Sequence, residues 1–471
     1  MRSTKHVVTQ ICFYDRTGIQ KMMEKQAAKG WMLEEIHNFT LQYRRVEPKK
    51  LHFAVTYYPK ASMFDPQPSG GEELYREYAA HSGWQFVTSN AQMQIFCSDA
   101  EDPIPIETDP LVELENIHKA AKKSYLSSYF LLLFCASLNL GLMIWRLIEN
   151  FTGTLVHNSN LFTISCWTIL FCMECWEICS YYIWRRKAIK AARLDGSFVE
   201  TSNRNPVMWL ILAVVGVGYL LLLTSITTHA VYLGLVVLGL MAGAVVLVLS
   251  FTRWMKKSGF SRADNRAFTV MATVFISLAV AGLSTFAVVT LMDNLPDEHI
   301  RENYAHNGMT ITRFGDELPL TVEDLTGEDD GDYSCYRTEE SSILIDRLIA
   351  NQYRKFGTGD GSNLRYVVVD VKCTPLFDAC LREYLTMYHN QKMTDIFGNE
   401  FFGEFYPIDP DPWGADRAWQ LHRLEEETEY LLVYGNRIVN FEFGKELNQG
   451  QMALVADILG NEQNFENNKN N

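Results

Sequence analysis

Residues 127–148 read SSYFLLLFCASLNLGLMIWRLI, and this apolar stretch decides the class of fold. A helix of about 20 apolar residues crosses a bilayer core, and only Arg146, near the end of the stretch, carries a charge. Four more stretches of this kind follow, at residues 161–184, 207–227, 230–251 and 267–292. The sequence therefore predicts a bundle of five transmembrane helices within residues 127–292 and excludes a single soluble globule.

The connections between these stretches alternate in charge. The link after the first stretch has Glu149 and His157 and no lysine or arginine, whereas basic residues follow the second and fourth stretches. Because lysine and arginine are retained in the cytosol, we expect a cytosolic N-terminus and a C-terminal block outside the plasma membrane. A four-span alternative, in which residues 207–251 do not cross twice, would keep that block in the cytosol. The basic residues are Arg185, Arg186, Lys187, Lys190, Arg193 and Arg204, and then Arg253, Lys256, Lys257, Arg262 and Arg266.

The formal net charge of -14 is unevenly distributed along the 471 residues. Residues 1–126 carry 15 basic and 16 acidic side chains, residues 127–292 carry 12 and 6, and residues 293–471 carry 15 and 34. Only the membrane-flanking loops are strongly basic, so the lipid bilayer is an expected partner and nucleic acid is not. No sufficiently long apolar run precedes residue 127, so we expect no cleavable signal peptide, and the first span is expected to act as the insertion signal.

The composition shifts divide the chain into five parts. We expect a cytosolic α+β domain at residues 1–108 and a juxtamembrane helix at 109–126. The membrane helices occupy 127–292, an extracytoplasmic α+β domain occupies 293–460, and a disordered tail occupies 461–471.

Residues 7–98 contain an internal repeat with an offset of 53 positions. Each copy has a helical pattern that ends in Gly-Trp, at Gly30 and Trp31 and again at Gly83 and Trp84, and continues as two extended segments. Glycine after the last turn can adopt the left-handed conformation that ends a helix, and the tryptophan can then cover the helix end. This order predicts two helices packed on one antiparallel sheet.

The first part of the chain resembles the domain-of-unknown-function family 2812, which is found in membrane proteins of Gram-positive bacteria. The resemblance covers residues 1–126 and rests on Phe13, Asp15, the run from Ala27 to Leu33, Tyr43, Tyr57, and the Ser82, Gly83, Trp84 motif. Proteins of this family are often described as encoded near PadR-like transcriptional regulators. By analogy, the resemblance implies a regulatory or sensory setting, and it implies no catalytic residue.

Trp31 and Trp84 admit two interpretations. Large aromatic side chains usually pack in a core, so both are candidate anchors at helix ends. In the alternative interpretation they bind a partner or a ligand, on a sheet face that also carries polar residues such as Gln42 and Arg44.

Residues 109–124 predict a helix that joins the first domain to the membrane. Asp109 is the expected N-cap, and Pro110 occupies the first turn. Apolar residues recur on one face of this helix, at Leu111, Leu114, Ile117 and Ala121. The helix either transmits movement from the first span or is a plain connector whose lysines contact anionic lipid headgroups.

Two carboxylates, Glu174 and Glu177, lie within the second predicted span. Their spacing puts both on one helical face, and Asn139 in the first span is the expected hydrogen-bond partner at comparable depth. Ionisable groups inside a membrane are functional candidates, so one hypothesis is a proton or cation site. The other is that neutral carboxyls fasten helices together. Cys172, Cys175 and Cys179 line nearly the opposite face and are expected to pack against apolar neighbours.

The block after residue 292 has the pattern of an α+β domain. Residues 364–371 predict a central strand, residues 374–389 a helix capped by Thr374, and residues 430–443 a hairpin that turns at Gly435 and Asn436. Residues 447–459 predict an amphipathic helix that ends at Gly460. Cys373 and Cys380 lie close enough in sequence for a disulfide, which the sequence leaves open.

Acidic residues in this domain are poor metal candidates. Asp409, Asp411 and Gly414 match positions 1, 3 and 6 of a calcium loop, but Trp413 and Gln420 occupy positions where ligands are required. The acidic run at 328–332 is expected to be solvated, and the glycines at 357–361 to form a turn. No metal or other cofactor is expected.

The sequence contains no catalytic or nucleotide-binding motif. The first hypothesis is therefore a non-enzymatic sensor or regulator that links the external domain to a cytosolic protein-binding domain, with a cytosolic regulatory protein as partner. The alternatives are a transporter or channel subunit that uses Glu174 and Glu177, and a membrane enzyme with an unrecognised site. Small residues in the last spans, such as Gly239 and Gly243, suit a compact bundle or a homo-oligomer.

Overall fold

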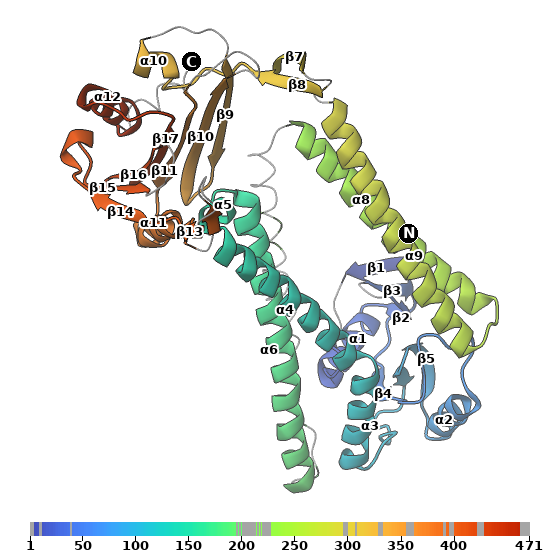
Figure 1. Ribbon diagram of the computed structural model, residues 1–471. Helices are drawn as coiled ribbons and strands as arrows, with labels where there is room; N and C mark the ends of the chain where they lie inside the picture. Colours follow the sequence, from blue (N-terminus) through green and yellow to red (C-terminus); the bar gives the residue numbers. More distant parts are fainter. Residues whose placement is uncertain are drawn as a thin grey trace. The chain divides into compact units, whose positions relative to one another are not determined.

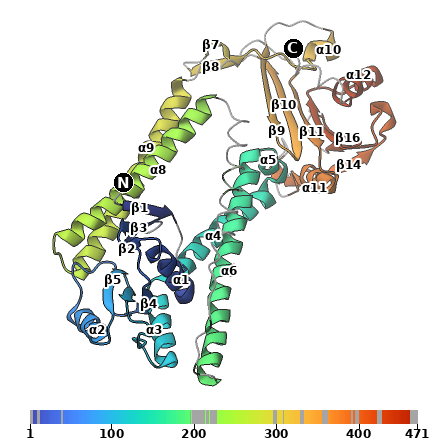
Figure 2. The ribbon, with the colours of Figure 1, turned by 180° about the vertical axis from the view of Figure 1, so that it is seen from behind.

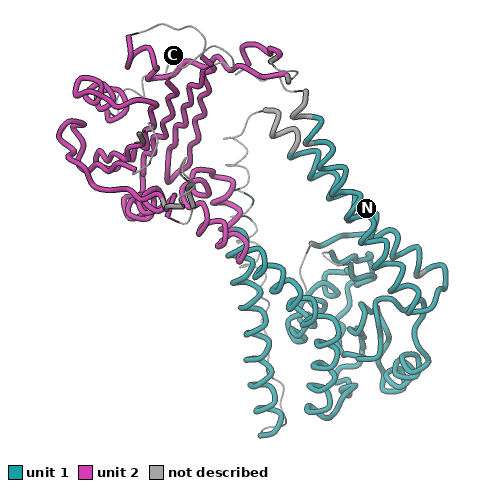
Figure 3. The backbone as a smooth tube through the Cα atoms, in the orientation of Figure 1, with its two compact units in different colours: residues 1–139, 166–294 teal, residues 140–165, 295–471 magenta. Residues whose placement is uncertain are grey.

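The structure is a computed structural model with two compact units (Figure 3). One unit comprises Met1–Asn139 and Cys166–Asn294, and the other comprises Leu140–Ser165 and Leu295–Asn471. Residues 140–165 therefore group with the C-terminal part of the chain. The structure describes residues 4–8, 12–37, 40–194, 228–294, 300–306, 309–327, 333–354, 362–389, 392–394, 400–421 and 428–461, with a few isolated positions between 196 and 218.

The N-terminal domain contains a β-α-β-β arrangement twice (Figure 1). Each copy forms its own three-stranded antiparallel sheet, with strand orders β1-β3-β2 and β4-β6-β5. The predicted repeat is confirmed. The single predicted sheet is wrong, because each copy pairs its backbone groups within its own three strands. The elements are β1 (Thr4–Val8), α1 (Arg16–Ala27), β2 (Trp31–Ile36) and β3 (Thr40–Arg45), then β4 (His52–Tyr57), α2 (Gly70–His81), β5 (Gln85–Asn90) and β6 (Met93–Ser98).

Local chemistry explains where the two helices begin and end. The Asp15 carboxylate accepts a hydrogen bond from the backbone N–H of Gly18 at 3.0 Å, and the Ser69 hydroxyl caps α2 in the same way. A short polar side chain thus satisfies an otherwise unpaired N–H at each N-terminus. Gly30 and Gly83 follow the helices with φ of 78° and 84°, which glycine adopts without a steric penalty.

The core of this domain explains why its strands read as apolar runs. Helix α1 packs Ile19 and Met23 into a core shared with both sheets. Strand β4 contributes Val55 to that core, whereas Ala54, on its opposite face, joins Trp84 in a second core. The second sheet is therefore buried on both faces.

Four helices follow the N-terminal domain, and two of them, α4 and α6, are candidate membrane segments. Helix α3 (Pro110–Lys123) is followed directly by α4 (Tyr125–Glu149), and α5 (Phe151–Leu155) leads into α6 (Asn158–Leu194). Asp109 caps α3 as predicted, since its carboxylate accepts a hydrogen bond from Leu111 N at 2.8 Å. At 1.5 Å per residue, α6 is about 55 Å long, so it extends beyond a bilayer core of about 30 Å.

Helices α8 (Thr228–Lys257) and α9 (Arg262–Asn294) pack against each other as a hairpin. Among the residues that the structure describes, four helices, centred on α4, α6, α8 and α9, are long and apolar enough to cross a membrane. Large apolar side chains on them are exposed, including Phe134, Leu247 and Phe275, as on a surface that faces lipid. These helices indicate a membrane protein. The predicted span at 207–227 lies outside the described residues.

The C-terminal domain is built on a seven-stranded antiparallel sheet of order β14-β15-β16-β17-β11-β10-β9 (Figure 2). The predicted strand at 364–371 and the predicted hairpin are both confirmed, the latter by the pairing of β16 with β17. The strands are β9 (Tyr333–Ser341), β10 (Ile345–Arg354), β11 (Leu364–Val371), β14 (Phe405–Ile408), β15 (Arg417–Leu421), β16 (Thr428–Tyr434) and β17 (Arg437–Phe443). Two smaller pairs are β7 (Ile300–His306) with β8 (Met309–Phe314), and β12 (Lys392–Thr394) with β13 (Glu400–Phe402).

Helices cover both faces of this sheet. Helices α10 (Val322–Thr326) and α12 (Gln449–Leu459) pack on one face, and α11 (Phe377–Thr386) packs with α5 on the other. Strand β11 alternates accordingly, with Tyr366 and Val368 in the first core and Val367 and Val369 in the second. A strand buried on both faces needs apolar residues throughout.

The helix predicted at 374–389 begins differently. Thr374–Leu376 form a 3₁₀ turn, η1, that precedes α11, and no side chain caps that turn. The prediction of Thr374 as N-cap is therefore wrong, because Thr374 lies within the turn and Cys373 occupies the capping position. The predicted tail, the acidic run at 328–332 and the glycines at 357–361 lie outside the described residues, except that residue 461 is described.

Candidate functional site

Glu174 and Glu177, the two carboxylates of the second predicted span, lie close to the first turn of α4. The hydroxyl of Tyr125, the first residue of α4, donates a hydrogen bond to Glu177 Oε2 at 3.2 Å. Glu174 lies one turn earlier in α6 and is only 5% exposed, and its Oε2 has no hydrogen-bond partner within the described parts of the chain. The carboxylates are therefore at the end of the membrane helices that adjoins the N-terminal domain.

Asn139 does not join this pair. Its side-chain amide donates to the carbonyl oxygen of Cys135 in its own helix at 2.8 Å. At 1.5 Å per residue it lies about 20 Å further along α4 than Tyr125. The expected pairing with Glu174 and Glu177 is wrong, because the chain reverses at α5 and the start of α4 lies beside the later part of α6.

An aromatic cluster joins the N-terminal domain to α4 and α6. The Tyr14 ring lies 5.0 Å from the Trp184 ring and 5.5 Å from the Tyr181 ring, and Phe13 stacks on Tyr125 at 5.6 Å. Tyr181 is fully buried. We call these five residues the junction cluster. Because they share one core, the domain and the two helix ends are expected to move together.

The loop at residues 58–69, called the clasp loop, contacts two more helices. Lys123, at the end of α3, donates to backbone carbonyls of the loop, the nearest at 3.1 Å. Arg262, which begins α9, forms an ion pair with Asp65 of the loop, with Nη2 2.7 Å from Oδ2. Asn265 is 1% exposed and donates to a loop carbonyl at 2.9 Å. The clasp loop thus contacts the first turn of α9 as well as the end of α3.

The two tryptophans of the repeat occupy different environments. Trp84 is 5% exposed, and its indole N–H donates to the carbonyl oxygen of Ile104 at 2.7 Å, which fits a core anchor. Trp31 is half-buried, with the Arg45 guanidinium 5.0 Å and the Lys5 ammonium 5.5 Å from its ring. Cations over an indole face are attracted by its electron density. Lys5 and Arg45 therefore gather around Trp31 and form a cationic edge of the first sheet.

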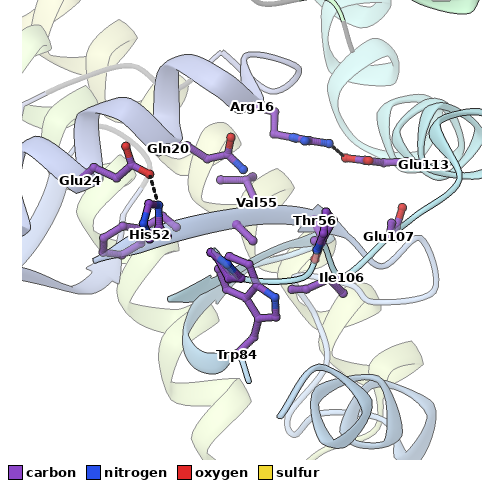
Figure 4. A pocket seen from close by; sticks show the side chains of 14 residues that line it. Arg16, Gln20, Glu24, His52, Val55, Thr56, Trp84, Ile106, Glu107 and Glu113 are labelled. Atoms are coloured by element: carbon purple, nitrogen blue, oxygen red, sulfur yellow. Dashed lines mark hydrogen bonds and ion pairs between the residues drawn. The ribbon is translucent and has the colours of Figure 1, made fainter. Parts of the chain in front are cut away.

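A cavity of about 210 Å³ lies between α1, β4 and the segment that leads from β6 to α3 (Figure 4). Arg16 on α1 forms an ion pair with Glu113 on α3, and His52 Nδ1 lies 4.0 Å from Glu24 Oε1. Trp84 forms part of the wall. Sequence reasoning missed this cavity, because its walls come from three separate segments and no spacing rule links them.

On the C-terminal domain, the connection between α4 and α6 is held by hydrogen bonds. Thr152 of α5 is 1% exposed, and both its backbone N–H, at 2.7 Å, and its hydroxyl donate to Glu383 Oε2 of α11. Asn158, at the start of α6, accepts a hydrogen bond from Ile343 N at 3.0 Å. Leu155 and Val156 are buried in the core under α11. The connection is therefore an integral part of that domain.

A second cavity, of about 310 Å³, lies between the β7–β8 hairpin and strands β9 and β10. Aromatic rings dominate its lining, and the rings of Phe314 and Tyr336 are 5.1 Å apart. Arg313, which forms an ion pair with Glu302, and Arg354 also line it. Aromatic walls with a few charged groups are typical of small-molecule sites.

The cysteines and the predicted metal candidates show structural roles. All ten cysteines are free thiols, including Cys373 and Cys380, and burial raises the pKa of Cys380 to about 11. Asp409 Oδ1 accepts a hydrogen bond from Asp411 N at 3.2 Å, in a turn that ends at Gly414 with φ of 53°. Over the described ranges, no group of three or more histidine, cysteine or acidic side chains could hold a metal ion.

Comparison with known proteins bears on the N-terminal part of the chain. No curated protein and no solved structure matches the chain. Residues 15–129 match the family model described as a protein of unknown function (DUF2812). This match spans both helices of the repeat, α3 and the first turn of α4, and it confirms the family resemblance of the N-terminal domain.

Proposed function

We propose that the protein is a non-enzymatic multi-pass membrane protein that relays the state of an external domain to a cytosolic, protein-binding domain. Its relay elements are α4, α5 and α6. The external cavity beside β7 and β8 is the candidate receiving site, and the N-terminal domain, which matches a family of unknown function, is the proposed partner-binding part. The cytosolic partner is a regulatory protein that recognises the N-terminal domain.

One observation carries this proposal: the cores of both soluble domains incorporate parts of the same helical connection. Leu126 of α4 and Tyr181 of α6 are buried in the core of the N-terminal domain. Leu155 and Val156, which lie between α4 and α6, are buried in the core of the C-terminal domain. Packed cores resist continuous deformation, so a shift at one end of these helices is expected to be passed along them.

The same contacts support an odd number of membrane crossings. The later part of α6 packs on the N-terminal domain through Ala188 and Ala192, and the first turn of α9 contacts the clasp loop. In the proposed topology both α6 and α8 end on the side of the N-terminal domain, and the chain crosses the membrane once more between them. The span that the sequence predicts at 207–227 is the proposed fifth crossing. Together with the basic residues after α6 and α8, this favours a cytosolic N-terminus and an extracytoplasmic C-terminal domain in the plasma membrane.

Labelling of single cysteines tests this topology. In a variant without native cysteines, we expect an impermeant maleimide to label Asn303→Cys on intact cells and to label Lys25→Cys only after lysis. Both positions are exposed. Gly18 is unsuitable, because a Cβ there would lie 2.2 Å from the Asp15 carboxylate. Labelling of Lys25→Cys on intact cells, or of neither variant before lysis, would contradict the proposed orientation.

The relay is tested at the contact between α5 and α11. Replacing Glu383 by glutamine removes the charge that accepts two hydrogen bonds from Thr152, and such bonds contribute about 1.5–3 kcal/mol. We expect the hydrogen–deuterium exchange rates of the α1 and α3 amides to change about fivefold, which is the lower end of the coupling usually found between two sites. The exchange is measured on the full chain in nanodiscs.

The matched control is Asp378→Asn, which removes an exposed carboxylate from the same helix. It should leave exchange in α1 and α3 unchanged. Because coupling is reciprocal, a substitution that loosens α1 should also alter exchange in α5. Faster exchange confined to α5 and α11 in Glu383→Gln would show that no relay exists.

A further inference from the structure

The cavity in the N-terminal domain has an excess of negative charge. Three carboxylates line it, from Glu24 on α1, Glu107 on the preceding loop of α3, and Glu113 on α3, against the single guanidinium of Arg16. Figure 4 shows that Arg16 points to Glu113 and that His52 points to Glu24. Arg16 pairs with the almost fully buried Glu113 and also attracts Glu107, so one guanidinium serves more than one carboxylate.

Two oxygen atoms at one end of the cavity have no hydrogen-bond partner among the described residues. Thr56 is 4% exposed, and its hydroxyl has no partner in hydrogen-bonding geometry within the described parts of the chain. Glu107 Oε1 accepts from the Tyr75 hydroxyl at 3.3 Å, whereas Oε2 is enclosed and without a partner there. Figure 4 places Thr56 beside Ile106, with Glu107 further along the same wall. An enclosed polar atom without a partner is costly, so a donor at this end would be stabilising.

The remaining wall is apolar. Val55, Ile106 and Trp84 line the cavity beside these polar atoms. The indole N–H of Trp84 is already bonded to Ile104 O, so Trp84 offers its ring surface to an occupant. Aromatic and aliphatic walls beside a surplus of carboxylates suit an ammonium or guanidinium group on a short hydrocarbon chain.

We propose that this cavity binds a small organic cation, an aliphatic amine or guanidine of a few carbons, with its charged group on Glu107 and Thr56 and its chain against Trp84. An anionic ligand is disfavoured, because the guanidinium of Arg16 is engaged by Glu113. The proposal is independent of the relay, since it concerns only the charge and shape of this cavity.

Calorimetric titration of the full chain in nanodiscs of zwitterionic lipid tests the proposal. The probes are putrescine and agmatine, with 1,4-butanediol as the uncharged analogue of putrescine and glutarate as an anion. We expect both cations to bind saturably and the diol and the anion not to bind. Equal binding of putrescine and 1,4-butanediol, binding of glutarate alone, or no binding of either cation would overturn the proposal.

Two variants locate the site. Glu107→Gln keeps an acceptor for Tyr75 but removes the charge, and we expect putrescine to bind at least about tenfold more weakly. Glu101→Gln, at an exposed position of the same segment, should bind as the wild type does. Gln20→Lys places an ammonium group in the wall of the cavity and should abolish binding without changing the melting temperature. Unchanged affinity in folded Glu107→Gln and Gln20→Lys would place the cation elsewhere and overturn the assignment.

Discussion

Replacement of Arg16 by methionine should destabilise the N-terminal domain by about 3 kcal/mol, because it leaves the Glu113 carboxylate buried without its partner. The Glu113 side chain is 3% exposed and that of Arg16 is 24% exposed, which places the expected effect at the lower end of the range for broken buried ion pairs. Protection of α1 and α3 amides from hydrogen exchange in the full chain should fall roughly a hundredfold.

The double variant Arg16→Met with Glu113→Gln provides the control. Removing both partners eliminates the uncompensated charge, so we expect most of the lost protection to return. A double variant as unstable as Arg16→Met would mean that the packing of the arginine chain, and not the ion pair, holds α1 to α3.

Replacement of Trp413 by alanine should destabilise the C-terminal domain by about 3–5 kcal/mol, the usual cost of truncating a fully buried tryptophan. Trp413 is 1% exposed, and its ring lies 4.6 Å from that of Tyr430. The substitution would leave a cavity under the turn that carries Asp409 and Asp411. We expect a lower melting temperature of the full chain and faster exchange in β16 and α12.

Tyr406→Ala is the matched control, because Tyr406 is 52% exposed in the same domain. Its effect should remain within about 0.5 kcal/mol, as for most surface substitutions. Similar losses in both variants would contradict the assignment of Trp413 to the core. Its burial also explains the poor calcium match, since an indole that anchors the turn stands where a loop would need an oxygen ligand.

Much of the local structure was predictable from contiguous residues. Asp109 and Pro110 begin α3, Gly83 ends the second repeat helix, and residues 364–371 form a strand buried on both faces. These features depend on capping, on backbone freedom and on side-chain periodicity, which act within a few residues.

Features that depend on distant partners were not predictable in this way. Residues 109–124 suggested a buried face that includes Leu111, yet Leu111 is 42% exposed and Glu113 is 2% exposed. The reason is Arg16, which belongs to the first repeat and supplies the charge that allows Glu113 to be buried. The partner of Glu177 likewise depends on the tertiary fold, which brings Tyr125 and not Asn139 close to it.

The sequence by itself determined four apolar helices that could cross a membrane, the repeat, the alternation of charge and the resemblance of the N-terminal domain to a family of unknown function. These follow from hydropathy, helix ends and local motifs, which are properties of continuous segments. Only the tertiary structure decided that each repeat forms its own sheet, that Glu113 and Thr152 are buried with partners from other elements, and that Glu107 and Thr56 face one cavity. The energy of a buried charge or hydrogen bond depends on its partner, and that partner is brought close by the fold of the whole chain.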